Sequence, residues 1–171
     1  LTMLDKVYED PACKDLKNPF EGHFESILTC KNGHTSVSKE PFCCLSINGG
    51  LDEGIAKLEE PEEVTCKCDH CEESEMVKTV TIHPSEVICV QFKRFDLSGK
   101  LTYKVALQEK WFGYKLIGIC NHMGSVHGGH YTSAVCVDGQ WRHMNDEDIQ
   151  EIDGLPKRSR VPYLLIYVAD K

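Results

Sequence analysis

Apolar and polar residues alternate with a period of two along much of the chain, which predicts a protein built largely from β-strands. The run EVICVQFKRF is almost wholly apolar through Phe92, which is typical of a central strand buried on both faces. The second half is predicted to be mostly antiparallel β-structure, and the first half mixed. We expect strands at 23–30, 41–47, 75–82, 86–95, 111–121, 130–138, 140–145 and 161–168.

Two segments have the spacing of a helix instead. Leu51, Ile55 and Leu58 share one face of a short amphipathic helix that Pro61 ends. The first residues, LTMLDKVYE, have helical spacing without an N-cap, so we expect them to be the tail of a helix that starts upstream of this chain. The fold class predicted from both patterns is α+β.

The segment HYTSAVCVDGQWRHMN predicts a β-hairpin, because Asp-Gly between two strand-like runs favours a tight turn. The return strand brings Asn145 and Asp146 back beside His130, at the start of the first strand. An Asn or Asp side chain bound to one imidazole nitrogen fixes the tautomer and leaves the other nitrogen as a base for a Cys or Ser nucleophile. The alternative is a structural His–Asp pair without catalytic function.

A cysteine cluster, TCKCDHCEE, predicts half of a metal site. Cys68 and Cys71 form a Cys-x-x-Cys turn, and zinc needs four ligands arranged tetrahedrally. The turn TCKNGHTS offers Cys30 and His34 as the second pair, with Cys66 as a substitute ligand. Two interpretations stay open: a structural zinc site, and a degenerate finger that has lost its metal.

Composition narrows the classes of partner and compartment. The net charge is −8, so nucleic acid is a poor default partner and a basic partner is more plausible. No apolar run is long enough to span a bilayer, and no signal peptide is visible, so we expect no membrane partner. Ten cysteines without such a leader favour a reducing compartment, cytoplasmic or nuclear.

Six blocks in order give the chain a resemblance to the catalytic domain of ubiquitin-specific proteases, the cysteine deubiquitinases. The blocks are NPFEGHFESILTC, KEPFCCLSI, CKCDHC, IHPSEVICVQFKRFD, YKLIGICNHMGSVHGGHYTSAV with QWRHMNDEDIQEI, and PYLLIYV. The resemblance covers residues 1 to about 169, and its specificity comes from the order and spacing of all six blocks.

The resemblance implies a papain-like cysteine protease fold with β-ribbon fingers and an antiparallel palm. It also implies that the fingers grip ubiquitin. It divides one catalytic domain into the end of the thumb helix and a linker (1–23), mainly fingers (24–84) and palm (85–171). It implies that this chain cleaves the bond after the last glycine of ubiquitin. The implied roles are general base for His130 and its orienting group for Asn145, with Asp146 able to share that role. They also include substrate binding for Gly128, Gly129 and Tyr131.

The family's nucleophile motif, of the Gly-Asn-Thr-Cys type, does not occur in these residues. Cys13 lies in a turn-rich loop, and the other nine cysteines fall in the expected fingers or on expected strands. We therefore expect the thumb, with its cysteine, to come from a missing segment or another chain. The alternatives are a catalytically inactive relative that binds ubiquitin or scaffolds a complex, and a plain zinc-ribbon interaction module.

Overall fold

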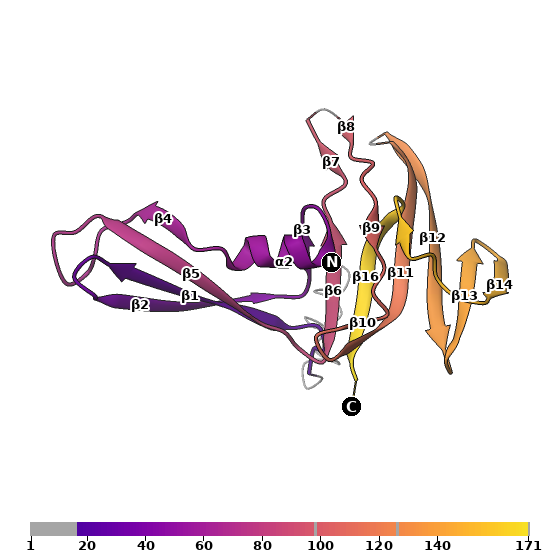
Figure 1. Cartoon of the computed structure of the whole chain (residues 1–171), viewed down its shortest axis with the longest axis horizontal. Helices are drawn as coiled ribbons and strands as arrows, with labels where there is room; N and C mark the ends of the chain where they lie inside the picture. Colours follow the sequence, from indigo (N-terminus) through magenta and orange to yellow (C-terminus); the bar gives the residue numbers. More distant parts are fainter. Residues whose placement is uncertain (1–16, 98, 126, 171) are drawn as a thin grey trace, which may run out of the picture.

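The computed structural model describes residues 17–97, 99–125 and 127–170. An elongated four-stranded sheet projects from one side of a larger, eight-stranded sheet (Figure 1). The described residues contain one helix, α2 (Leu51–Glu59), which lies at the junction between the sheets. The structure is mostly antiparallel sheet with a small helical part, as the pattern predicted. The helix expected at the first residues lies outside the described part of the chain.

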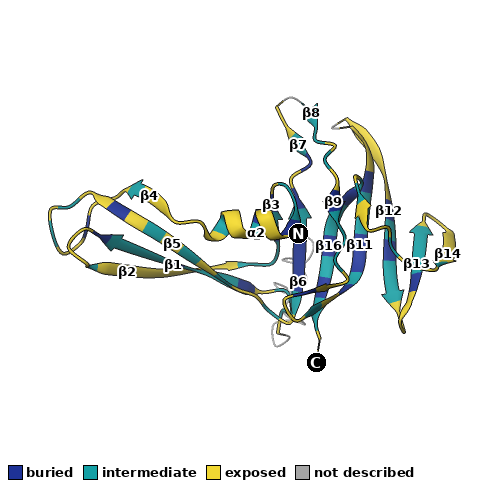
Figure 2. Ribbon diagram, in the orientation of Figure 1, coloured by how far each residue is buried: buried dark blue, intermediate teal, exposed yellow. Residues whose placement is uncertain are grey.

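The projecting sheet has the strand order β2-β1-β5-β4. Its long central pair, β1 (Gly22–Cys30) and β5 (Glu75–His83), is antiparallel. β2 (Thr35–Phe42) and β4 (Glu62–Thr65) form its edges. The tip has a core of its own, in which Cys30, Cys68 and Met76 are buried. Along the rest of this sheet the central strand β1 is half-buried and the edge strand β2 is exposed (Figure 2).

The larger sheet has the order β14-β13-β12-β11-β16-β6-β3, and β10 pairs with β11. Its neighbours are antiparallel except β3 and β6, which are parallel. The strands are β3 (Leu45–Ile47), β6 (Val87–Phe92), β10 (Lys110–Trp111), β11 (Tyr114–Ser125), β12 (Gly128–Val137), β13 (Gln140–Asn145), β14 (Asp148–Ile152) and β16 (Pro162–Ala169).

The expectation of one strand over 41–47 is wrong. The chain leaves the projecting sheet after Phe42 and enters the larger sheet at Leu45, so Cys43 and Cys44 lie between strands rather than on a finger strand. The polar residues before Pro41 form β2, which pairs with β1 over its whole length. β2 is almost entirely exposed, so no apolar alternation marks it as a strand.

The main core lies on one face of the larger sheet. Val90, Phe92, Leu165 and Tyr167 are inaccessible to solvent in this core. The run expected at 86–95 forms β6, which is largely buried but lies one strand in from the edge of the sheet rather than at its centre. The helix covers part of this core, and Trp111 Nε1 donates a hydrogen bond to Asp52 Oδ1 (3.0 Å) across the contact. β3 and α2, which fall within the range expected to be mainly fingers, thus pack with the larger sheet.

Two small two-stranded sheets complete the fold. β7 (Phe95–Asp96) pairs with β8 (Gly99–Lys100), and β9 (Val105–Ala106) pairs with β15 (Arg158–Ser159). The β7–β8 strands stand beside the β11–β12 turn at one end of the larger sheet (Figure 1). No helix among the described residues has the length and apolar character needed to cross a bilayer.

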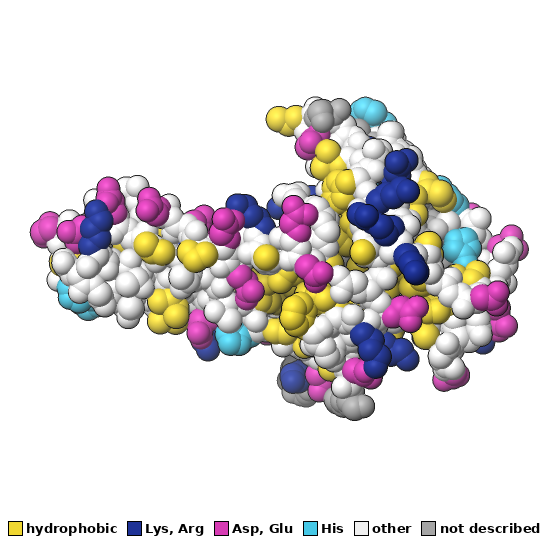
Figure 3. Space-filling model, viewed as in Figure 1, with side chains coloured by type: hydrophobic (Ala, Val, Ile, Leu, Met, Phe, Trp, Pro, Cys, Tyr) yellow, Lys and Arg dark blue, Asp and Glu magenta, His cyan; other side chains and the backbone are white. Residues whose placement is uncertain are grey.

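Surface charge is distributed unevenly. Asp and Glu side chains are spread along the projecting sheet and α2, whereas Lys and Arg side chains gather over the position of β9 (Figure 3).

Candidate active site and metal centre

The β12–β13 hairpin places an imidazole beside an amide. The strands pair in the register Ser133↔Met144, with Asp138 and Gly139 at positive φ in the turn, as the sequence predicted. Continuing that register sets Asn145 opposite Thr132, on the same face as His130 two residues away. There the Nε2 of His130 contacts the Oδ1 of Asn145. Because the amide oxygen only accepts, Nε2 carries the proton and Nδ1 keeps its lone pair as a base.

Asp146 occupies a different position from the one expected of a second orienting group. It lies in the two-residue turn between β13 and β14, with φ 53°, and is exposed. Among the described contacts of His130, Asn145 is the hydrogen-bonding partner, and none involves Asp146. The structure therefore brings His130 together with Asn145, and a shared role for Asp146 stays a prediction.

Gly129 and Gly128, which precede His130, differ in their surroundings. A Cβ on Gly129 would lie 2.1 Å from His122 Nε2 and 2.5 Å from the Met123 carbonyl oxygen, so only glycine permits this approach of the backbone. A Cβ on Gly128 would meet nothing within 4 Å. Gly129 thus fixes the backbone of the turn, while Gly128 leaves open space beside it.

His122 is a residue of this site that the sequence reasoning missed. Its side chain is buried on β11 and stacks on Tyr131, with ring centroids 4.7 Å apart. Lys100 Nζ donates to its carbonyl oxygen (2.9 Å) and lies 3.5 Å from its Nδ1. Burial, and then the nearby Lys100 charge, lower the pKa of the His122 imidazole. The register His122↔Tyr131 brings the two residues together across β11 and β12, and no local pattern in the sequence indicates this pairing.

Tyr131, expected to bind substrate, has its ring 54% exposed beside this site. It packs edge-on against Tyr163, with centroids 6.3 Å apart. Packed with His122 and Tyr163, Tyr131 therefore presents an accessible aromatic surface on the other face of β12 from the His130 side chain.

None of the cysteines that the structure describes lies beside His130. Cys120 pairs with Ser133 on the opposite face of the sheet from His130, three residues along. Cys136 shares the face but is six residues away on β12, roughly 20 Å at the rise of a strand. Cys89 is three strands away on β6. The described part of the chain thus holds the His130–Asn145 pair without a thiol in reach.

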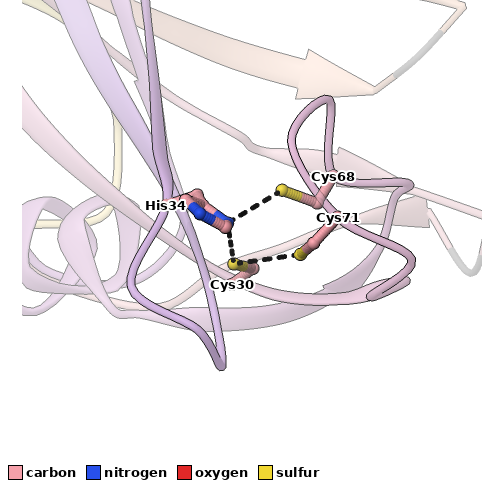
Figure 4. A group of neighbouring side chains, drawn as sticks. All are labelled: Cys30, His34, Cys68 and Cys71. Carbon is pink, nitrogen blue, oxygen red and sulfur yellow. Dashed lines mark hydrogen bonds between the residues drawn. The ribbon is translucent and has the colours of Figure 1, made fainter.

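The second site lies at the tip of the projecting sheet, where Cys30, His34, Cys68 and Cys71 converge (Figure 4). Cys30 ends β1, and His34 follows a turn in which Gly33 has φ 81°. The two other cysteines come from the loop between β4 and β5. All four ligand atoms lie within 4.8 Å of one another, so the structure brings together the four residues that the sequence grouped.

The distances fit a tetrahedral zinc ion. Ligands bound to zinc at its usual S and N bond lengths lie roughly 3.5–3.8 Å apart. Here the Cys30 Sγ–His34 Nδ1, Cys68 Sγ–His34 Nδ1 and Cys30 Sγ–Cys71 Sγ distances are 3.5, 3.8 and 3.9 Å. Three soft sulfurs and one imidazole nitrogen are also a donor set that zinc favours.

Hydrogen bonds favour the thiolate form of Cys71, one of these four residues. Asn32 Nδ2 donates to Cys71 Sγ (3.4 Å), and this bond, helped by the Glu73 backbone, lowers the pKa of the Cys71 thiol to about 6. The thiolate that results is the form that binds metals. Cys66 is exposed and its Sγ faces the Lys67 carbonyl oxygen, outside the four-residue group.

Comparison with known proteins decides the family. The profile of the family described as ubiquitin carboxyl-terminal hydrolase matches residues 4–167. The chain belongs to this family. This confirms the resemblance drawn from the six sequence blocks, and the described antiparallel sheets with one helix have the fingers-and-palm form expected of its ubiquitin-specific proteases.

Curated members of the family are similar over most of this chain. Human ubiquitin carboxyl-terminal hydrolase 21 is 28% identical over 193 residues, covering 93% of this chain and 34% of its own length. The probable ubiquitin carboxyl-terminal hydrolase 8 of Schizosaccharomyces pombe is 23% identical, covering 92% of this chain and 39% of its own length. This chain thus spans little more than a third of these relatives.

Solved structures of the family share the fold. One, a SAGA DUB module bound to monoubiquitin, superposes with a TM-score of 0.81 at 24% identity, covering 99% of this chain and 47% of the other. A second SAGA DUB module structure gives a TM-score of 0.79 at 25% identity, covering 97% and 44%. The described residues therefore correspond to slightly less than half of a larger family fold.

Proposed function

We propose that this chain is the base-bearing, ubiquitin-gripping part of a cysteine deubiquitinase. The reaction is thiol-dependent hydrolysis of the isopeptide or peptide bond after the C-terminal glycine of ubiquitin. The observation that carries the proposal is the contact between His130 and Asn145 in a chain of the ubiquitin carboxyl-terminal hydrolase family. The nucleophilic cysteine comes from a segment outside these 171 residues or from another chain, because no described cysteine is in reach of His130 and Cys13 lies in PACKD, which lacks the family's nucleophile motif.

In the proposed reaction, each proton transfer involves the His130 imidazole. Nδ1 of His130 takes the proton of the incoming thiol, and Asn145 holds the ring by accepting from Nε2–H. The thiolate attacks the glycine carbonyl carbon, and the tetrahedral intermediate collapses as the C–N bond breaks. His130 then gives its proton to the leaving amine. Water, deprotonated by the same imidazole, hydrolyses the thioester and releases the carboxylate and the thiol. Donors that stabilise the intermediate's oxyanion are expected on the missing part.

Ubiquitin as the partner is supported by the family and by the related SAGA DUB module, whose structure holds monoubiquitin. Gly128 has open space on its Cβ side and Tyr131 is exposed, so both are accessible to a narrow Gly-Gly tail. We also propose a structural zinc ion at Cys30, His34, Cys68 and Cys71, which would hold the turn after β1 against the β4–β5 loop. Zinc supplies no step of the reaction.

The test is release of a fluorophore from the ubiquitin C-terminus by the full-length protein. We expect His130→Ala to reduce kcat at least 100-fold, because no other described group holds a base at this position. Asn145→Ala should reduce kcat about 10- to 100-fold. Asn145→Asp should keep most of the wild-type kcat, because a carboxylate also accepts a hydrogen bond from Nε2–H. Equal rates for wild type and His130→Ala would refute the assignment of the base.

The second candidate function is a catalytically inactive ubiquitin-binding module, and the distance of every described cysteine from His130 favours it. The two functions differ in one measurement. An inactive module would bind ubiquitin with the same affinity in wild type and His130→Ala while releasing no fluorophore. Turnover by the wild-type protein would exclude it.

A further inference from the structure

The β9–β15 pair carries a cluster of cations on its outward side. The register Ala106↔Arg158 and Ser159↔Val105 places Lys104 opposite Arg160. Lys104, Arg158 and Arg160 therefore share one face of the pair, while Val105 on the other face is fully buried in the core. These three exposed residues are the β9–β15 basic face, and in Figure 3 Lys and Arg side chains gather over the position of β9.

The charges of this face are not neutralised within the described residues. None of its three cations forms an ion pair with another described residue, although the whole chain has an excess of acidic residues and a net charge of −8. On the projecting sheet, by contrast, Lys39 pairs with Glu25 (3.1 Å) and Lys78 with Glu62 (3.4 Å). Like charges that face each other across a strand pair destabilise it. The pair of Lys104 with Arg160 is such an arrangement, and the fold keeps it.

A buried cation lies beneath the same face. Arg94 is 2% exposed, and its guanidinium donates to the carbonyl oxygens of Pro162 (2.9 Å) and Tyr103 (2.7 Å). Its Nη2 is buried without a partner in the described structure. These carbonyls belong to the two segments that carry Lys104 and Arg160. Because an arginine stays charged in proteins and its charge is weakly screened when buried, Arg94 strengthens the positive potential of the surface above it.

The basic face is close to the proposed active site. The Val161 carbonyl oxygen, one residue after Arg160, accepts a hydrogen bond from the His122 backbone (2.8 Å). His122 lies across from Tyr131, the residue after His130. Two strand spacings, roughly 10 Å, thus separate the end of the basic face from the base. A polypeptide joined to ubiquitin at the cleaved bond reaches this face within a few extended residues.

We propose that the β9–β15 basic face binds an Asp- and Glu-rich segment of the ubiquitinated target protein, next to the bond that is cleaved. The inference rests on the proposed deubiquitinase function. It adds that the target protein is acidic next to the cleaved bond. Local positive potential attracts an acidic polypeptide and raises its rate of association. Nucleic acid fits less well, because a long polyanion would also meet the acidic projecting sheet and α2.

The first experiment measures kcat/KM of the full-length protein on ubiquitin fused through its C-terminus to an acidic peptide, to the matched Asn/Gln peptide, or to a small fluorophore. We expect the acidic fusion to be cleaved about three- to tenfold faster than the neutral one at low salt, with the preference shrinking as salt screens the charges. R158E/R160E should remove the preference and leave fluorophore release unchanged. K57E/K110E, an equal change of charge at exposed lysines elsewhere, should keep it.

A preference that persists in R158E/R160E, or equal rates of the two fusions in wild type, would overturn the proposal. Binding of the free acidic peptide, measured by fluorescence anisotropy, tests the face even if the protein has no hydrolase activity. The proposal requires at least threefold weaker binding by R158E/R160E and unchanged binding by K57E/K110E. Tighter binding of a DNA duplex with the same number of charges would assign the face to nucleic acid instead.

Discussion

At the scale of single residues, the proposed active site depends on the close approach of β12 to β11 at Gly129. Gly129 lies against the His122 ring and the Met123 carbonyl, and His130 follows directly. The position of the base is therefore determined by an approach that any side chain at 129 would prevent. Gly128, one residue away, has no such neighbour and serves as a matched control.

We expect Gly129→Ala to lower the free energy of unfolding by about 1–3 kcal/mol, because the added methyl group displaces the His122 ring or the β11 backbone. Gly128→Ala should change it by less than about 0.5 kcal/mol. Urea denaturation of the full-length protein measures both. Equal stability of the two variants would show that the backbones are less closely packed than described.

The imidazole of His122 should titrate below its ordinary value. Burial and the Lys100 ammonium both disfavour the imidazolium, so NMR titration should give a pKa under 6.5, and Lys100→Met should raise it. The unfolded chain then binds the proton more readily than the folded one. The contribution of His122 to stability is thus complete above about pH 6.5 and declines as the pH falls below it. Lys104→Met, away from His122, should leave its pKa unchanged.

At the scale of elements, local signals explain which strands could be predicted. The β12–β13 hairpin was predictable because Asp138-Gly139 sets the turn, and the turn sets the register that brings Asn145 to His130. β2 and β14 were missed because both are exposed edge strands without apolar alternation. The parallel pairing of β3 with β6 depends on residues far apart in the chain, which no local pattern encodes. His122 was missed for the same reason, since its role comes from a cross-strand neighbour.

The loop between β4 and β5 and the turn after β1 should bind one zinc ion per chain. Cys68→Ser removes a buried ligand, so we expect loss of the zinc and faster hydrogen exchange in both segments. Cys66→Ser changes an exposed thiol outside the group, and its zinc content should match wild type. Elemental analysis of the purified full-length variants decides: a metal-free wild type would refute the zinc site, and loss of zinc from Cys66→Ser would reassign its ligands.

At the scale of the whole molecule, we propose a different function for each of the two large sheets. The projecting sheet extends from the larger one with α2 at the junction, while His130, Tyr131 and the β9–β15 basic face lie on the larger sheet or beside it (Figure 1). We infer that one sheet grips ubiquitin and the other holds the bond and the target. The chain matches about half of each solved relative by length, so a complete enzyme needs the remaining part of the fold.

The measurement that tests this account most directly is covalent capture by ubiquitin carrying an electrophile at its C-terminus. The full-length protein is labelled, digested and analysed by mass spectrometry to find the modified cysteine. The account predicts one labelled cysteine outside the 171 residues, with labelling slowed at least 100-fold by His130→Ala and only a few-fold by Asn145→Asp. Label on any of the ten cysteines of this chain, or ubiquitin binding without any label, would contradict it.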